Sequence, residues 1–314
     1  MGWLLGELAG AGAKHVAFSG GEPLLRRDLP AIMRKGRAAG IKAYSLVTNG
    51  LAADAARVAQ LRKAGLVSAQ VSLDGVDAKD HCAVRQCPPI AFYRALRAIR
   101  LFQDAGVVVD IAAIVTPRNI ARAPEMVLLA EALKVRSLRY CSFVPTGRAV
   151  SPKIAERFAC EPAQLDQLLE FMRVVFEAAK KGRDGKRAST VGMLIDHGIG
   201  PWKADGSFRC DSGEAVCYIS SEGDLYPCPG LIFDRFKVGN VYETPIAELL
   251  ESPAMSRVRS IDRASIGEPC ASCDNDRCSG GCRGAAFATS GSELAAPRYC
   301  NVLRRKKRGR GPRR

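Results

Sequence analysis

The first half of the chain alternates short apolar segments with helical segments that end near glycine, and this alternation constrains the fold more than any other feature. The predicted strands are residues 14–19, 43–47, 67–73, 107–115 and 137–143. The predicted helices are residues 28–40, 54–65, 90–106, 124–133 and 162–181. Strands that are apolar on both faces and separated by helices form parallel βα units. Five strands are too few for a closed eight-stranded barrel, so we expect an α/β fold, a partial (β/α) barrel.

Polar motifs follow three successive predicted strands. Gly20-Gly21-Glu22-Pro23 follows the first strand, Thr48-Asn49-Gly50 the second and Ser72-Leu73-Asp74-Gly75 the third. Functional residues of (β/α) folds gather at the carboxyl ends of the strands, so we expect these motifs to share one rim. Glycines let a ligand approach the backbone, and a carboxylate accepts hydrogen bonds from an ammonium group. Arg85, which we place in a loop, suits a carboxylate partner. Taken alone, the first motif is equally typical of a simple turn and Arg85 of a solvated surface arginine.

Eight of the twelve cysteines lie in the last third of the sequence. Cys210, Cys217 and Cys228 are followed, after 41 residues, by a Cys-x2-Cys-x4-Cys-x3-Cys run over 270–282 and then by Cys300. Thiols two to four residues apart can ligate one metal centre because the turn between them points both sulfurs inward. With no secretory signal recognised, metal ligation is expected rather than a disulfide framework. Eight thiolates suit two [4Fe–4S] clusters or two zinc ions, and their number does not distinguish the two.

This cysteine-rich segment resembles the SPASM domain of radical S-adenosylmethionine (SAM) maturases. The resemblance rests on the 223–228 sequence Gly-Asp-Leu-Tyr-Pro-Cys, on 237–241 and 246–250, and on the later cysteine spacing. It implies two [4Fe–4S] clusters with interleaved ligands. The implied ligands of one cluster are Cys210, Cys217, Cys228 and Cys282. The implied ligands of the other are Cys270, Cys273, Cys278 and Cys300. Four residues separate Cys273 from Cys278 where the family usually has five, which we interpret as a small turn adjustment.

The three rim motifs resemble the radical SAM fold, over residues 1–150. The SAM-binding residues that this resemblance implies are Gly20, Gly21, Glu22, Thr48, Asn49, Ser72 and Arg85. The first three would hold the amino end of SAM. Ser72 and Arg85 would lie near its ribose and carboxylate, and Thr48 and Asn49 would line the pocket.

The Cys-x3-Cys-x2-Cys loop that defines the family does not occur in the sequence. In the family its three thiolates leave one iron open for SAM, whose reductive cleavage yields a 5′-deoxyadenosyl radical, and this chemistry belongs to the cofactor. Family spacing places that loop well upstream of Gly20, which only 19 residues precede. Our interpretation is that the sequence begins one βα unit late, so that an extended chain binds three clusters and this one at most two. A degenerate family member is the alternative.

The resemblance implies a radical SAM oxidoreductase or maturase that modifies a peptide or a haem-type tetrapyrrole, inactive as written if the loop is truly missing. Residues 278–285 and 144–148 most resemble the haem-pathway branch. Pro229 stands where sulfatase-maturing relatives carry an aspartate, and we predict no substrate-side catalytic residue. Two alternatives stay open: a non-catalytic iron–sulfur relay or binding module, and a zinc-dependent nucleic-acid-binding protein.

The sequence also predicts how the chain is divided into domains. We divide the chain into a radical SAM barrel with a connecting helix (1–182), a linker (183–207), a SPASM domain (208–302) and a disordered tail (303–314). The tail carries eight lysines or arginines and no acid, out of a net charge of +15.

No apolar run approaches the roughly 20 residues of a membrane span, and we recognise no signal peptide. We therefore expect a cytoplasmic protein, reduced by a flavodoxin or ferredoxin, with no membrane or nucleic-acid partner.

Overall fold

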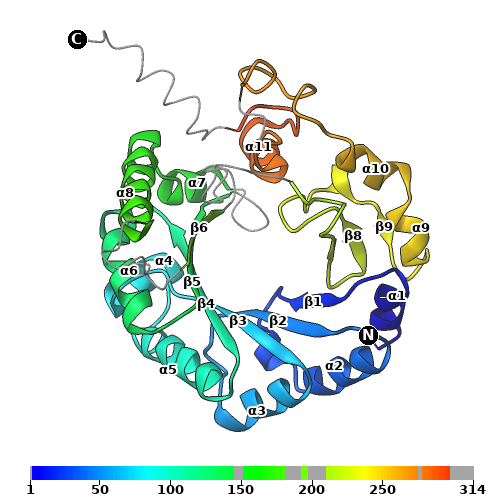
Figure 1. Ribbon diagram of the computed structural model, residues 1–314, viewed down its shortest axis with the longest axis horizontal. Coiled ribbons are helices and arrows are strands. Elements are labelled where there is room, and N and C mark those ends of the chain that lie inside the picture. The colour runs from blue at the N-terminus through cyan, green and yellow to red at the C-terminus, as the bar shows by residue number, and fades with distance from the viewer. Residues whose placement is uncertain (1, 145–150, 181–191, 197–209, 275–277, 298–314) are drawn as a thin grey trace. The chain divides into compact units, whose positions relative to one another are not determined.

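The computed structural model describes residues 2–144, 151–180, 192–196, 210–274 and 278–297 (Figure 1). The basic tail, nearly all of the predicted linker, Cys300 and residues 145–148 lie outside these ranges. The chain divides into two compact units. The first contains Met1–Tyr140 with Arg187–Met193 and Val241–Glu248. The second contains Cys141–Lys186, Leu194–Asn240 and Leu249–Arg314.

A six-stranded sheet forms the core of the barrel, and its strands follow one another in chain order. The strands are β1 (His15–Phe18), β2 (Ala43–Thr48), β3 (Leu66–Ser72), β4 (Val108–Val115), β5 (Ser137–Ser142) and β6 (Gly192–Asp196). The pairs from β1 to β4 are parallel. The α/β fold with parallel strands is therefore confirmed, and each of the five predicted strands is present. The sixth, β6, falls within the segment predicted as a linker.

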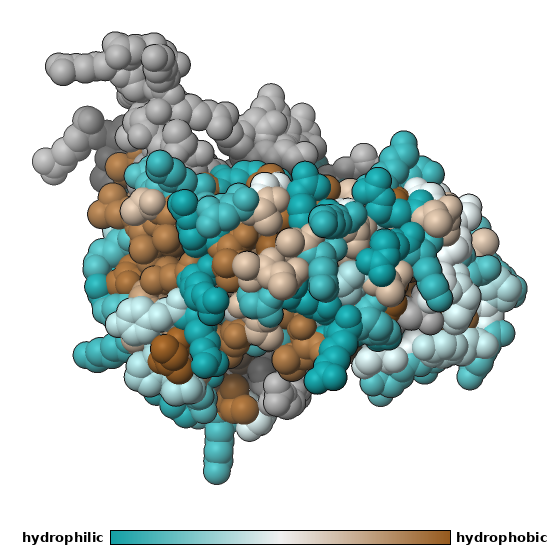
Figure 2. Space-filling model, turned by 90° about the horizontal axis from the view of Figure 1, so that it is seen from below, coloured by the Kyte–Doolittle hydropathy of each residue, from teal (hydrophilic) through white to brown (hydrophobic). Residues whose placement is uncertain are grey.

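Helices connect these strands. They are α1 (Gly2–Gly10), α2 (Leu29–Ala38), α3 (Ala55–Lys63), α4 (Ala78–Arg85), α5 (Ile90–Asp104) and α6 (Ala123–Ala132), with single 3-10 turns η1 (Pro23–Leu25) and η2 (Ile120–Arg122). In Figure 1, α2, α3 and α5 lie along the outside of β1–β4. Helix α5 buries Ala95, Ala98 and Phe102 and exposes arginines on its other face, as a helix covering a sheet requires. Figure 2, which views the molecule from this side, shows hydrophilic side chains running between hydrophobic ones.

Helix α4 corrects one expectation, because Arg85 is the last residue of this helix and not part of a loop. The Asp77 side chain caps the helix by accepting a hydrogen bond from the Asp80 backbone N–H at 2.9 Å. The helix has eight residues, and only His81 is buried. So short a helix with so little apolar surface leaves no periodic pattern in the sequence.

The second unit combines helices with a small antiparallel sheet. Its helices are α7 (Pro152–Phe158), α8 (Pro162–Lys180), α10 (Pro253–Arg259) and α11 (Arg283–Ser290), with the turn η4 (Asp234–Phe236). Helix α9 (Ile246–Leu250) joins the units in sequence. Strands β7 (Tyr218–Ile219), β8 (Asp224–Tyr226) and β9 (Gly239–Asn240) pair in that order. Tyr226, Leu231, Phe236 and Val258 form the buried core beside them. Across the described residues, no helix is long and apolar enough to cross a bilayer.

Candidate cofactor rim and cysteine domain

Glu22 accepts three hydrogen bonds, and two of them join the first two rim motifs. Its Oε1 atom accepts from the Thr48 hydroxyl at 2.6 Å and from the Leu24 backbone N–H at 3.0 Å. Its Oε2 atom accepts from the Asn49 backbone N–H at 2.8 Å. The donors from Thr48 and Asn49 hold the loop after β1 against the end of β2. The structure thus brings Glu22, Thr48 and Asn49 together, and it gives Glu22 a bracing role that the sequence did not indicate.

Open space lies beside the two glycines that precede Glu22. Gly20 has a φ angle of +103°, a conformation that favours glycine. A Cβ atom added at Gly20 or at Gly21 would meet no atom within 4 Å. Packing therefore does not require a glycine at position 21, and the exposed backbone there is free to approach a ligand.

The turn after β2 is fixed by its own polar atoms. The Thr48 hydroxyl accepts from the Gly50 N–H at 3.0 Å, and the Asn49 side chain accepts from the Leu51 N–H at 2.8 Å. Gly50 has a φ of +76°, and a Cβ there would lie 2.7 Å from the Cβ of Ala98 on α5. Only glycine suits this position, so the turn stays close to the helix behind it.

Asp74 is the centre of a second, buried network. Its side chain is fully buried, accepts from the Ile114 N–H at 2.6 Å and pairs with the Nε atom of Arg85. Its backbone carbonyl accepts from the Asn119 side chain at 2.7 Å, and its N–H donates to Nδ1 of His81 at 3.1 Å. Burial is the largest effect on His81 and lowers its pKa, which keeps Nδ1 free to accept.

This network positions Arg85 at the rim. The guanidinium group has five N–H donors, and Asp74 takes the one on Nε. The side chain is 30% exposed, and its bond to Asp74 uses Nε rather than the terminal nitrogens. Ser72 is the last residue of β3. The residue before it, Val71, pairs with Thr48 on the neighbouring strand β2, so Ser72 lies one residue beyond the level of Thr48. The sequence missed Asn119 as a partner of this rim, although it is a polar residue that follows the fourth strand.

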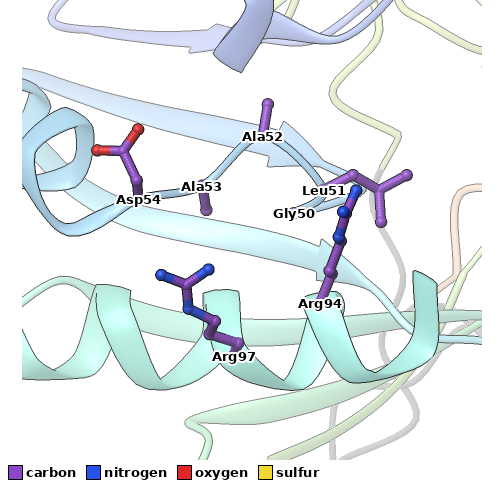
Figure 3. A pocket seen from close by; sticks show the side chains of 7 residues that line it. All are labelled: Gly50, Leu51, Ala52, Ala53, Asp54, Arg94 and Arg97. Carbon is purple, nitrogen blue, oxygen red and sulfur yellow. The ribbon is translucent and has the colours of Figure 1, made fainter. Parts of the chain in front are cut away.

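A cavity of about 300 Å³ opens beside the turn after β2 (Figure 3). Its lining residues are Gly50, Leu51, Ala52, Ala53, Asp54, Arg94 and Arg97. Figure 3 shows both arginines rising from α5 and Asp54 coming from the loop before α3. The Asp54 carboxylate already caps α3 by accepting from the Arg57 N–H at 2.8 Å. None of the predicted SAM-binding residues lines this cavity.

In the cysteine-rich region, two glycines bring predicted ligands of the first cluster together. A Cβ added at Gly230 would lie 3.7 Å from Sγ of Cys228 and 4.0 Å from Sγ of Cys282, so both sulfurs flank this residue. A Cβ added at Gly284 would lie 2.2 Å from the carbonyl oxygen of Gly230. Only glycine at position 284 lets the start of α11 pack against the turn that carries Cys228.

Cys210 belongs to the same neighbourhood. Its N–H donates to the Ser279 hydroxyl at 2.9 Å, which ties it to the loop before Cys282. Burial, and to a smaller extent the Cys210 thiol, raise the pKa of Cys228. Burial also raises the pKa of Cys217. Of the second predicted set, Cys270 and Cys273 share a turn through the Cys273 N–H and the Cys270 carbonyl at 3.1 Å.

Arg283, which the sequence did not single out, is a buried cation beside these thiols. It is only 2% exposed and donates to the backbone carbonyls of Gly280, Gly281, Glu293 and Ala295. Burial lowers the pKa of Arg283. Four predicted ligands, led by Cys270 and Cys210, raise that pKa. Backbone N–H groups lie 3.4 Å from the sulfurs of Cys278 and Cys282. A nearby cation and N–H donors favour the thiolate form that binds iron.

A single metal ion and a four-iron cluster need different arrangements of donors. Among the described residues, no three His, Cys, Asp or Glu side chains converge closely enough to hold one metal ion. A four-iron cluster binds each thiolate at a different iron, so its ligands surround a volume rather than a point. The sulfurs of Cys228 and Cys282, which both lie near Gly230, agree with ligands placed around a cluster.

Comparison with known proteins assigns both the barrel and the cysteine-rich region to known families. Residues 4–130 match the radical SAM superfamily, and residues 210–274 match the SPASM iron–sulfur cluster-binding domain. The AdoMet-dependent heme synthase of Methanosarcina barkeri is 30% identical, over 94% of this chain and 84% of that protein. The PqqA peptide cyclase of Granulibacter bethesdensis is 28% identical, over 92% of this chain and 75% of that protein.

A solved structure shares the fold. The structure of native anSMEcpe with bound AdoMet and Cp18Cys peptide aligns with a TM-score of 0.73 at 20% identity, over 96% of this chain and 86% of that one. The family matches, and the heme synthase that is 30% identical, thus agree with the features of the structure. These features are the parallel barrel, the braced rim and the cysteines around Gly230. Members of these families bind SAM and [4Fe–4S] clusters. The chain therefore belongs to the radical SAM enzymes that carry a SPASM iron–sulfur domain.

Proposed function

We propose that this protein binds SAM on the rim around Glu22 and uses it to modify a peptide or a haem-type tetrapyrrole. The observation that carries the proposal is the Glu22 carboxylate, which braces the ends of β1 and β2 beside the open backbone of Gly20 and Gly21. SAM bound at a reduced cluster would supply a 5′-deoxyadenosyl radical. The residues named here bind and orient.

Each rim residue has a role in this proposal. The exposed glycine backbone and the remaining lone pairs of Glu22 receive the SAM ammonium group. The terminal nitrogens of Arg85 receive the carboxylate, since Asp74 occupies only its Nε atom. Ser72, at the end of β3, faces the ribose, and Thr48 and Asn49 complete the wall.

For the clusters, we propose the two interleaved ligand sets. One comprises Cys210, Cys217, Cys228 and Cys282. The other comprises Cys270, Cys273, Cys278 and Cys300. The approach of Cys228 and Cys282 to Gly230 supports the first set. The buried Arg283 supports both, because it lies within electrostatic reach of members of each.

Iron content and SAM turnover test this proposal together. After anaerobic reconstitution we expect about eight irons per chain, which corresponds to two four-iron clusters. With dithionite and SAM, an active enzyme releases 5′-deoxyadenosine. Two clusters without any 5′-deoxyadenosine would support the relay module instead, and would agree with the missing Cys-x3-Cys-x2-Cys loop. A colourless protein that contains zinc would overturn the cluster assignment.

The two candidate substrate classes are tetrapyrroles and peptides. The similarity to a heme synthase and to a peptide cyclase supports a tetrapyrrole or a peptide. We propose to measure SAM cleavage by the reconstituted chain in the presence of each class. The true substrate should increase the yield of 5′-deoxyadenosine and return a product with an altered mass. The flavodoxin or ferredoxin donor and the cytoplasmic location stay predictions.

A further inference from the structure

Two cysteines outside the predicted cluster ligands lie in direct sulfur–sulfur contact. The thiol of Cys87 donates to Sγ of Cys82 at 3.0 Å. The thiol of Cys82 in turn donates to the carbonyl oxygen of Pro88 at 3.4 Å. Neither cysteine belongs to the SPASM region or to the predicted SAM-binding residues, so neither is accounted for by the proposed function.

A specific turn brings these sulfurs together. Cys82 lies in the last turn of α4, and the chain reverses at Gln86, which has a φ of +52° and a ψ of +50°. The Gln86 N–H donates to the Cys82 carbonyl at 2.7 Å. A left-handed residue directly after a helix returns the chain toward its last turn. Few non-glycine residues adopt this conformation, so the placement of Cys87 over Cys82 is a defined feature of the fold.

The chemistry of the pair favours a disulfide over a metal site. Both thiols are half-buried, which leaves them within reach of a small oxidant. Burial, followed by the hydrogen bond with Cys82, raises the pKa of Cys87 to about 11. Metal binding and nucleophilic attack both need the thiolate, which so high a pKa disfavours, so a disulfide is inferred from the contact between the two sulfurs and not from the reactivity of Cys87. Among the described residues, no third donor converges with the pair around a metal ion.

We propose that Cys82 and Cys87 form a reversible disulfide, which makes the end of α4 an oxidation site. A peroxide oxidises the Cys82 thiol to a sulfenic acid and is itself reduced to water. The Cys87 thiol then attacks that sulfur, so that the S–S bond forms, the S–O bond breaks and a second water leaves. Two thiols thereby give two electrons and two protons to one peroxide, and a dithiol reductant reverses the reaction.

The proposed disulfide encloses Arg85, whose guanidinium group pairs with the buried Asp74. The oxidation site therefore borders the residue that we propose for the SAM carboxylate. This link to SAM rests on the proposed function, whereas the disulfide itself depends only on the contact between the two sulfurs.

Peptide mapping tests the inference directly. The reconstituted full chain is treated anaerobically with hydrogen peroxide, its free thiols are blocked with iodoacetamide, and it is digested with trypsin without reductant. Because trypsin cleaves after Lys79, Arg85 and Arg94, the disulfide would join peptide 80–85 to peptide 86–94. We expect this linked species to be two hydrogens lighter than the two thiol peptides together, and to disappear with dithiothreitol.

Single variants make the result specific. Cys82→Ser and Cys87→Ser must each abolish the linked species, whereas Cys160→Ser, which removes a buried thiol elsewhere, must leave it. Separate alkylation of Cys82 and Cys87 after peroxide treatment, or crosslinks from either to other cysteines, would overturn the inference. A linked species in a protein that does not bind SAM would count against the proposed function and leave this inference standing.

Discussion

At the scale of single residues, Glu22 gives the clearest prediction. Glu22→Gln keeps the size of the side chain but replaces one acceptor oxygen with an NH2 group, which must face either Thr48 and Leu24 or the Asn49 N–H. The NH2 group would then face another donor with no acceptor between them, which costs about 1–3 kcal/mol. We expect that loss in the free energy of unfolding and weaker SAM binding, measured by denaturant titration and calorimetry. Glu7→Gln, at an exposed position on α1, should change neither.

His81 makes stability depend on pH. Burial lowers the pKa of His81 in the folded protein below its ordinary value of 6.5, so below that pH the unfolded chain takes up a proton more readily. The stability contributed by the neutral side chain is therefore present above about pH 6.5 and is lost as the pH falls. Urea titrations between pH 5 and 8 should show this loss.

The matched variant for this experiment is His81→Gln, which retains a hydrogen-bond acceptor for the Asp74 N–H without titrating. It should flatten the pH dependence in this range. An unchanged slope in the variant would assign the effect to other groups.

At the scale of elements, the contact between Gly284 and Gly230 predicts a strong effect of one methyl group. Gly284→Ala would place a Cβ against the Gly230 carbonyl and push the start of α11 away, together with Cys282. On the proposed two-cluster assignment we expect loss of the first cluster, seen as about half the iron of the wild-type chain.

The control for this variant is Gly6→Ala, whose added Cβ meets nothing within 4 Å on α1. An alanine in a helix stabilises it by roughly 0.5–1 kcal/mol relative to glycine. Full iron content in Gly284→Ala would show that the packing of α11 does not position Cys282.

The sequence predicted elements well where apolar spacing was strong. The ends of β2, β3 and β4 lie within one residue of the predicted ends, because buried residues recur along each strand and the apolar runs stop at polar rim residues. Helix α4 and strand β6 were missed. In α4 the helix is determined by the Asp77 cap and by tertiary contacts of Asp74 and Arg85, which local spacing cannot reveal.

For the site, sequence motifs identified which residues gather but not how they are joined. Glu22, Thr48 and Asn49 were expected on one rim, and they share hydrogen bonds there. Asn119 lies 45 residues from Asp74, and Arg283 holds carbonyls 2 to 12 residues away, but both act largely on backbone carbonyls. Such contacts leave no sequence signature because any residue can supply a carbonyl.

At the scale of the whole molecule, removal of iron should affect the two units differently. Ligand binding contributes to folding wherever thiolates from distant segments meet on one cluster. The first unit has a buried apolar sheet that needs no metal. After chelation, limited proteolysis should cut between residues 210 and 297 first and leave a fragment containing residues 2–140. Equal rates of cleavage in both regions would contradict this expectation.

The buried position of Arg283 also bears on how readily the iron centres take up an electron. Reduction adds negative charge to a group already surrounded by thiolates, and the potential of such a group depends on the net charge nearby. A fixed positive charge, held by four backbone carbonyls and screened from water, reduces the electrostatic work of that step. With clusters bound at the proposed ligands, the same arginine that shapes the loop before α11 would move them toward milder reductants.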